Sequence, residues 1–414
     1  MSVFWTNIDK LQLVCIFISS FLISRVLIVA KIPERLVLYL IGKKHLPIST
    51  IIFYVIFASA LLSFFIPNVI TVLTLLPMIK ILRRMFEESL PHRYKALETI
   101  FPLSIIYGAN IGGMGSITGT PANGIMVLYA TFYKLPGLEY LNFQYWLLWG
   151  VPLVLVFILA AWFVLSAAFR LWTYQNELVQ VTFSETQAFH PLQRTAIRLT
   201  TLSFLLFVLL SVLMKTSEAK LGVLFISVFL TLLLIVVLFL IPLRGNHGGT
   251  SGRLLTIRDC YSNLPWRGLV FVGVILVILG LGALLNLEEV IMRFFERMVR
   301  VNIPASLLFP LIALLTSFST ELFSNTVVQV AMFTVVARLL GDSGLIAFHA
   351  FLIITLSCTN AFMTPIATGV NGLAFGEMKG ISLSTMLIAG LLMKLFGVAI
   401  IAFGTPLLVG WVLS

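Results

Sequence analysis

Two stretches of the chain decide the fold: IIYGANIGGMGSITGTPANGIM at residues 105–126 and ITLSCTNAFMTPIATGVNGLAF at residues 354–375. Each starts as an apolar run and is then interrupted by glycine, proline and small polar residues. Glycine costs a helix up to about 1 kcal/mol relative to alanine, and proline costs about 3 kcal/mol. We therefore predict one broken helix in each half of the chain.

Each of these stretches follows an apolar segment that is itself interrupted. The first covers about residues 49–84 and contains IPNVITVLTLLPMIKILRRM, and the second covers about residues 303–340 and contains FSNTVVQVAMFTVVARLL. In the first, Pro67 and Asn68 separate arms of about 17 residues, which as helix span about 25 Å, slightly less than the hydrocarbon core of about 30 Å. Both segments are either re-entrant hairpins or pairs of short spans joined by a tight turn.

The composition of the whole chain requires a membrane. Of its 414 residues, 60% are hydrophobic and 10% are charged, and the mean hydropathy is +1.08. Soluble domains carry about 25% charged residues, so a soluble globule is excluded. Apolar runs of about 20 residues, the length of a transmembrane helix, predict an all-α polytopic membrane protein. We expect full spans at residues 11–30, 98–133, 143–169, 199–215, 221–242, 267–286, 344–376 and 384–412.

The formal net charge of +11 reflects topology rather than nucleic-acid binding, because the basic residues lie in short loops between the apolar runs. The positive-inside rule places both chain ends outside and both flanks of the first interrupted segment in the cytoplasm. It also gives the second interrupted segment an approach from the opposite face. This arrangement predicts an inverted repeat, in which each half contains a re-entrant hairpin and a broken transmembrane helix.

The predicted organisation divides the chain into five parts. Residues 33–47 and 286–304 combine an apolar face with charges and are predicted to be interfacial amphipathic helices. In chain order, we expect a first span with a cytoplasmic interfacial helix at residues 1–48, the first hairpin and broken helix at 49–142, scaffold spans and an interfacial helix at 143–302, the second hairpin and broken helix at 303–383, and a last span at 384–414.

The interrupted helices suit a site that holds an anion together with a cation. A half-helix presents free N–H groups at its N-terminus, which attract anions, and carbonyls at its C-terminus, which attract cations. A single glycine or threonine in a membrane helix serves packing more often than binding, but a paired and repeated set favours a binding site. The small polar residues beside the breaks are Ser116, Thr118, Thr120, Asn123, Asn325, Thr326, Thr364, Thr368 and Asn371.

At these positions the sequence resembles the divalent anion:sodium symporter family, whose members carry citrate, succinate and related dicarboxylates or sulfate. The resemblance rests on YGANIGGMGSITGTPAN at residues 107–123, TELFSNT at residues 320–326 and CTNAFMTPIATGVNG at residues 358–372. It runs from about residue 11 to the end of the chain. It implies an elevator-type carrier, in which the hairpins and broken helices form the moving transport domain.

The same resemblance implies the residues of the site. The substrate-binding residues carried over by motif are Asn68, Thr120, Ser324, Asn325, Thr326 and Thr368. One Na+ site is implied near Ser63, Asn68 and Gly119, and a second near Thr320, Asn325 and Ala367. No other cofactor or metal is expected, since Cys15, Cys260 and Cys358 have no ligand-like spacing.

The sequence departs from the family pattern in two places. The first hairpin tip reads Pro67-Asn68-Val69 where the family has Ser-Asn-Thr, so two hydroxyls are missing from the first sodium site and from one carboxylate contact. One span precedes the first hairpin where the family has about four. We therefore expect either a shortened member or a scaffold that is completed by a partner subunit or a second copy, as in a homodimer.

Two ionisable residues are predicted at membrane depth. For Glu321, the sequence favours a structural hydrogen-bonding role over proton coupling, although an ionisable group within the membrane is by default a functional candidate. For Lys394, the sequence favours snorkelling to the interface, or pairing with a neighbouring helix, over attraction of the substrate.

The sequence thus predicts an integral, multi-pass protein of a bacterial cytoplasmic membrane. Its function is predicted as symport of a small divalent or carboxylate anion with sodium or protons. Two alternatives stay open: an antiporter or oxyanion efflux protein of the same superfamily, and a transport-inactive subunit of a membrane complex. An enzyme is disfavoured, because the chain has no His/Cys metal spacing and no nucleophile–base motif.

Overall fold

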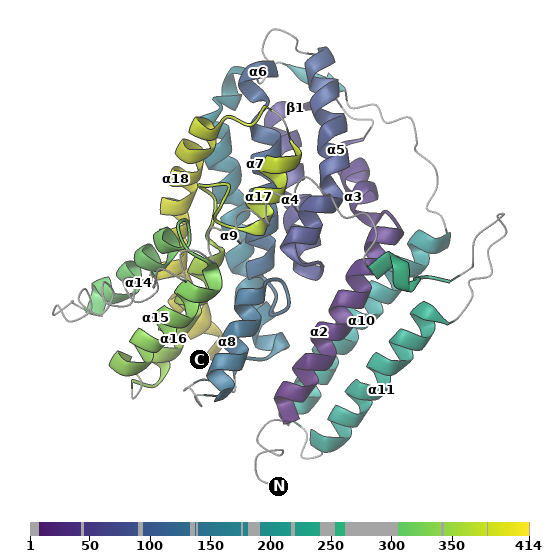
Figure 1. Cartoon of the computed structure of the whole chain (residues 1–414), viewed down its shortest axis with the longest axis vertical. Helices are drawn as coiled ribbons and strands as arrows, with labels where there is room; N and C mark the ends of the chain where they lie inside the picture. The colour runs from purple at the N-terminus through teal and green to yellow at the C-terminus, as the bar shows by residue number, and fades with distance from the viewer. Residues whose placement is uncertain are drawn as a thin grey trace.

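The chain folds into a set of packed helices, shown in the computed structural model in Figure 1. The structure describes residues 8–42, 45–89, 94–132, 137, 140–174, 177–180, 191–216, 220–240, 253–260, 305–340, 343–378 and 380–413. The expected span at 267–286 and the expected interfacial helix at 286–304 lie outside these residues. Six helices of the described part are long and apolar enough to cross a membrane.

The first half contains the predicted helix pair and the predicted broken helix. Helix α4 (Ile48–Phe65) ends at Ile66–Pro67, and α5 (Asn68–Ser89) starts directly afterwards. After the short α6 (Tyr94–Leu97), helix α7 (Ile100–Met114) stops and the chain continues without helix until α8 (Pro121–Phe132). The glycines and Pro121 therefore break the helix as the sequence predicts.

The second half repeats this order of elements. Helices α14 (Ala305–Ser319) and α15 (Asn325–Leu340) form the helix pair, and α16 (Leu345–Thr359) and α17 (Gly369–Glu377) form the broken helix. In Figure 1, α7 lies above α8, whereas α16 lies below α17. The chain thus runs through the two broken helices in opposite directions.

A separate bundle consists of α2 (Ile8–Val29), α10 (Pro191–Thr216) and α11 (Lys220–Phe239), which lie side by side in Figure 1. The hydroxyls of Ser19 and Thr231 are 3.1 Å apart and join α2 to α11. We call these helices the three-helix bundle. Near it, α3 (Ile32–Ile41) occupies the position of the predicted first interfacial helix.

Helices α9 (Phe143–Ala168) and α18 (Leu383–Ala399) pack on the two halves rather than on the three-helix bundle alone. The predicted last span is not one regular helix, since the π-helical segment η4 (Ile400–Gly404) separates α18 from α19 (Thr405–Leu413). Short helical turns lie at Leu171–Tyr174 (η2) and Ile257–Cys260 (η3).

Helices α4 and α7 pack closely, and glycine makes this close packing possible. A Cβ atom at Gly108 would lie 2.5 Å from the Ile56 carbonyl oxygen, and one at Gly112 would overlap the Ala60 carbonyl. Ser59 and Ser63 of α4 donate to the carbonyls of Ile105 and Ala109 at 2.8 and 2.7 Å. Small residues at such interfaces let membrane helices approach closely, so α4 holds the break of α7–α8 in place.

A small exception to the all-α prediction is a two-stranded antiparallel sheet. Strand β1 (His45–Pro47) pairs with β2 (Leu178–Gln180), with Leu46 opposite Val179. Three-residue strands are too short to give an alternating pattern. The sequence therefore holds no signal for them.

Candidate ion and anion site

The first break is closed by the side chain of Asn123, two residues into α8. Its Nδ2 donates to the carbonyls of Gly113 at 3.0 Å and Ser116 at 2.8 Å. The Asn123 backbone N–H points to the Thr120 hydroxyl oxygen, 3.4 Å away. The Gly113 carbonyl belongs to the end of α7 and the Ser116 carbonyl to the loop. The helix has ended at this point, so no helical N–H four residues later donates to them. One amide therefore bridges the end of α7 and the loop, and the Gly119 N–H also donates to the Ser116 carbonyl at 3.0 Å.

The second break is closed in the same way by Asn371. Its Nδ2 donates to the carbonyls of Ala361 at 3.2 Å and Thr364 at 2.8 Å, and its backbone N–H donates to the Thr368 hydroxyl at 3.2 Å. Each of these residues follows its counterpart in the first break by 248 residues. The pairing of Thr120–Asn123 with Thr368–Asn371 is therefore matched by equivalent hydrogen bonds. We call the two arrangements the asparagine clamps.

Asn110 of α7 connects the first half to the second clamp. Its Nδ2 donates to the Ala361 carbonyl at 2.8 Å and to the Asn371 Oδ1 at 3.2 Å, and its Oδ1 accepts from the Asn68 Nδ2 at 3.4 Å. Asn110 is fully buried. The tip of the first helix pair is thus joined to the second break by three amides. The sequence analysis did not single out Asn110. The one sign of its role is that it is a polar amide among the apolar and glycine residues of the GANIGG run.

Helix N-termini meet across the two halves. A Cβ atom at Gly369, the first residue of α17, would lie 3.6 Å from Val69 at the start of α5. Near the start of α15, Gln329 donates to the Ala122 carbonyl of α8 at 2.8 Å. Each helix pair therefore contacts the broken helix of the other half. The positive ends of α5 and α17 lie together, an arrangement that favours a negative charge.

The predicted site residues divide into two groups. Asn68 and Thr368 belong to the amide network, because the Thr368 hydroxyl donates to the Asn371 Oδ1 at 3.0 Å. The hydrogen bonds of the described residues do not join Ser324, Asn325 or Thr326 to this network. The predicted residues that are buried are Ser63, Asn68, Gly119, Thr120, Thr320 and Ala367; Ser324, Asn325 and Thr368 are half-buried, and Thr326 is exposed.

Among the described residues, three asparagine oxygens are buried without a hydrogen-bond donor: the Oδ1 atoms of Asn123, Asn325 and Asn360. A neutral amide oxygen is a suitable ligand for a hard monovalent cation, as are the backbone carbonyls at both breaks. No group of three or more His, Cys, Asp and Glu side chains that could hold a metal ion occurs within the described residues. The donor set therefore fits Na+ better than a transition metal.

Comparison with protein families agrees with this chemistry. The model of the citrate transporter family matches residues 4–299 of the chain. The chain belongs to this family. The resemblance to the divalent anion:sodium symporters is thereby confirmed. The family is one of transporters rather than enzymes. With six helices in the described residues that are long and apolar enough to cross a bilayer, the chain is an integral membrane protein.

Curated relatives carry names of the same kind. The human Na(+)/dicarboxylate cotransporter 3 is 26% identical over 335 residues, which cover 73% of this chain and 54% of the relative. The sodium-dependent dicarboxylate transporter SdcS of Staphylococcus saprophyticus is 24% identical over 426 residues, covering 97% of this chain and 78% of the relative. The chain thus spans about half the length of the human cotransporter that it matches.

A buried ion pair lies in the second half of the chain. The Lys394 Nζ lies 2.7 Å from the Glu321 Oε1, and the two side chains are 0% and 3% exposed. Glu321 also accepts from the backbone N–H of Met363 at 3.2 Å, and from the N–H and hydroxyl of Thr364 at 2.8 and 2.7 Å. Glu321 thus makes hydrogen bonds of the kind that the sequence favours for it. Snorkelling of Lys394 is wrong, since the side chain ends on a carboxylate inside the protein, and pairing with a neighbouring helix is correct.

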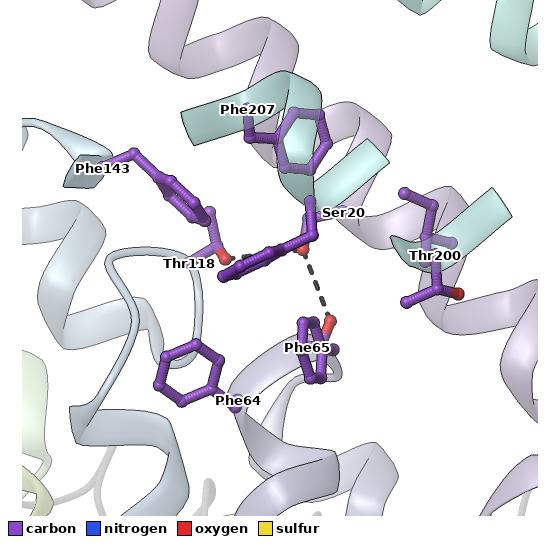
Figure 2. Close-up of a pocket in the computed structure, with 9 residues that line it drawn as sticks. Ser20, Phe64, Phe65, Thr118, Phe143, Thr200 and Phe207 are labelled. Atoms are coloured by element: carbon purple, nitrogen blue, oxygen red, sulfur yellow. Dashed lines mark hydrogen bonds between the residues drawn. The ribbon is translucent and has the colours of Figure 1, made fainter. Parts of the chain in front are cut away.

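A pocket lies between the three-helix bundle and the first break (Figure 2). Ser20 of α2 donates to the Phe65 carbonyl and to the Thr118 hydroxyl, both at 3.4 Å. The walls are mainly aromatic and carry hydroxyls but no charged side chain, so the pocket is a contact surface rather than an anion site. Its lining residues are Ser20, Ile23, Phe64, Phe65, Thr118, Phe143, Thr200, Phe204 and Phe207.

Proposed function

We propose that the chain is a secondary active transporter that moves a small dicarboxylate or related divalent anion across the membrane together with sodium. The observation that carries this proposal is the pair of asparagine clamps. They hold two breaks open at equivalent positions of a repeated fold, and non-helical backbone at membrane depth is tolerated only where it is enclosed by protein or lines a cavity. The names of the relatives supply the substrate and coupling ion.

The anion binds, in this proposal, where the N-termini of α5 and α17 meet. Asn68 and Thr368 lie there and provide an amide and a hydroxyl. Ser324, Asn325 and Thr326 approach the anion from the second helix pair, and Thr120 lies at the start of α8. This arrangement uses helix dipoles and neutral donors instead of a basic side chain, so the anion is released without breaking a salt bridge.

The family resemblance implies a sodium site beside each tip. The first site is proposed near Ser63, Asn68 and Gly119, and the second near Thr320, Asn325 and Ala367. The unpartnered Oδ1 of Asn325 supports the second site. At the first site, the Ser63 hydroxyl donates to the Ala109 carbonyl at 2.7 Å, so its oxygen lone pairs face away from that bond and stay usable for a cation.

The two halves form an inverted repeat and move together as the transport domain of an elevator. The opposite directions of α7–α8 and α16–α17 in Figure 1 support the inversion. The three-helix bundle is the static scaffold, since it meets the first half at the aromatic pocket of Figure 2. We assign α18 to the moving part as well, because Lys394 ties it to Glu321.

Thermal stabilisation tests the proposal directly. Purified protein is heated with succinate, citrate or sulfate, each in sodium or potassium at equal ionic strength, because a ligand of the folded state raises the unfolding midpoint by mass action. We expect a dicarboxylate to raise the midpoint in sodium and not in potassium. No shift with any anion contradicts the proposal and favours a transport-inactive subunit.

A substitution tests the site assignment. Asn325→Ala removes the unpartnered oxygen, and we expect it to abolish the sodium-dependent shift. Asn142→Ala is the matched control, because Asn142 caps α9 by accepting from the Tyr145 N–H at 2.9 Å and is not one of the proposed site residues. An Asn325→Ala protein with the full shift would contradict the assignment.

A further inference from the structure

The Lys394 ammonium lies where three oxygens converge. The Ser317 carbonyl accepts from Nζ at 2.5 Å, the Asn360 carbonyl accepts at 2.8 Å, and the Glu321 carboxylate lies at 2.7 Å. Ser317 is in the last turn of α14, and Asn360 is the C-cap of α16. Carbonyls at helix C-termini carry partial negative charge. Two such ends and one carboxylate form a ligand set for a monovalent cation.

The chain positions this ammonium by close packing of α18 on the second break. A Cβ atom at Gly390 would lie 2.5 Å from the Met363 Cα, and one at Gly397 would overlap the Asn360 amide. Gly390, Lys394 and Gly397 share one face of α18, because residues four and seven apart lie together on a helix. The Lys394 carbonyl in turn accepts from the Asn360 Nδ2 at 3.2 Å. The ammonium is therefore fixed rather than free to leave.

The repeat provides an internal comparison. Phe64 precedes Asn68 by four residues, as Glu321 precedes Asn325. On the packing helix, Val154 follows Gly150 by four residues, as Lys394 follows Gly390. Phe64 and Val154 both lie beside Gly115, 248 residues before Met363. In the first half, two apolar side chains thus occupy the positions that Glu321 and Lys394 occupy in the second half. The fold therefore does not require the ion pair.

The ion pair is also a poor choice for stability alone. Charges taken out of water lose hydration, and replacing a buried pair by apolar residues is often neutral or stabilising. The ammonium is joined to the proposed second sodium site through one carbonyl, because the Thr320 hydroxyl donates to the same Ser317 oxygen at 2.9 Å. A fixed positive charge at this place disfavours a second cation nearby.

We propose that Lys394 is a built-in cation of the second half, which takes over the charge neutralisation that a sodium ion would otherwise supply beside Glu321. Of the two sodium sites considered above, only the first then binds a free ion, and the ammonium takes the place of the second ion. This inference deepens the proposed sodium coupling, and its meaning for transport rests on that proposed function. The test measures the response to sodium in the absence of any anion, so the inference and the proposed function can fail separately.

The test compares Lys394→Met with the double variant Glu321→Gln/Lys394→Met. Unfolding midpoints are measured without anion in sodium and in choline at equal ionic strength. In Lys394→Met the carboxylate and two carbonyls are left for a free cation, and we expect its sodium-induced rise to exceed that of the unaltered chain by about 2 °C or more. In the double variant, which lacks the carboxylate, the rise returns to that of the unaltered chain.

A Lys394→Met protein with the same sodium response as the unaltered chain overturns the inference. Should that variant not fold, binding of labelled sodium to the unaltered chain decides: saturation at no more than one ion per chain supports the inference, and two ions overturn it. A sodium response gained by Lys394→Met in a protein that no anion stabilises would leave the inference standing and the proposed transport function wrong.

Discussion

At the scale of single residues, the two clamps depend on the amide group. An asparagine Nδ2 carries two protons and reaches two carbonyls at once, which is how Asn123 and Asn371 each close a break. Buried carbonyls without a donor are costly. The clamps therefore make a permanently broken helix compatible with a membrane.

The variant Asn371→Asp tests the contribution of the second asparagine clamp, because it replaces Nδ2 by an oxygen. The carboxylate keeps the shape of the amide but cannot donate, so it faces the carbonyls of Ala361 and Thr364 with repulsion. The Ala361 carbonyl keeps the Asn110 amide as a donor, and the Thr364 carbonyl keeps the Ala367 N–H. The two lost hydrogen bonds therefore predict a loss of about 1–3 kcal/mol in the free energy of unfolding. Thermal unfolding in detergent measures it.

The matched control is Asn142→Asp. Asn142 accepts from the Tyr145 N–H at the N-terminus of α9, and aspartate caps helices about as well as asparagine. We expect a change within about 0.5 kcal/mol. Equal losses in the two variants would contradict the clamp.

The sequence predicts the clamp positions but not their full environment. The matching Thr-x-x-Asn runs reveal Asn123 and Asn371, because both follow a break directly. Asn110 is not predicted, because a single amide within an apolar helix forms no pattern that indicates its contacts. The partner of Lys394 is equally hidden: Glu321 lies 73 residues earlier, and only the packing of α18 on the second break brings the two together.

At the scale of elements, glycine sets how closely α4 and α7 pack. Gly112→Ala would drive a Cβ atom into the Ala60 carbonyl, and backbone cannot move aside as a side chain can. We expect a loss of about 1–3 kcal/mol, the range for overpacking a core. The readout is the unfolding midpoint.

Gly124→Ala in α8 is the matched control. A Cβ atom there would lie 3.6 Å from Phe17, an ordinary contact, and alanine is the better helix former by up to about 1 kcal/mol. This variant should be neutral or slightly stabilised. Destabilisation by Gly124→Ala to the same extent would contradict the packing argument.

Interrupted elements are predictable because their causes are local. Proline and glycine mark the ends of α4 and α7 within two residues of where the structure has them, whereas α16 ends six residues before Pro365. Gly397, Gly404 and Pro406 flank or lie in the π-helical segment Ile400–Gly404, but the run around them is apolar enough that the sequence predicts a single span at residues 384–412. The β1–β2 pairing depends on segments more than 130 residues apart, which local pattern cannot reveal.

At the scale of the whole molecule, the proposed mechanism requires the two halves to move relative to the static three-helix bundle. Ser20 and Thr118 join the two parts at 3.4 Å. The variant Ser20→Cys/Thr118→Cys, in a chain whose native cysteines are replaced by serine, fixes the bundle to the first break when oxidised. We expect oxidation to stop anion uptake in proteoliposomes and reduction to restore it.

The control pair lies within the three-helix bundle. Ser19→Cys/Thr231→Cys, whose native hydroxyls are 3.1 Å apart, joins α2 to α11 and crosses no proposed sliding surface. Uptake should survive its oxidation. Full uptake by the oxidised Ser20/Thr118 cysteine pair, with the cross-link verified, would contradict relative motion at this surface.

Sodium-driven uptake tests the central claim most directly. The unaltered chain is reconstituted into proteoliposomes, an inward sodium gradient is imposed, and labelled succinate inside the vesicles is followed over time. The account predicts accumulation above the external concentration that collapses when the sodium gradient is dissipated and is absent when potassium replaces sodium. Equal accumulation in potassium, or no uptake beyond that of protein-free vesicles, would contradict it.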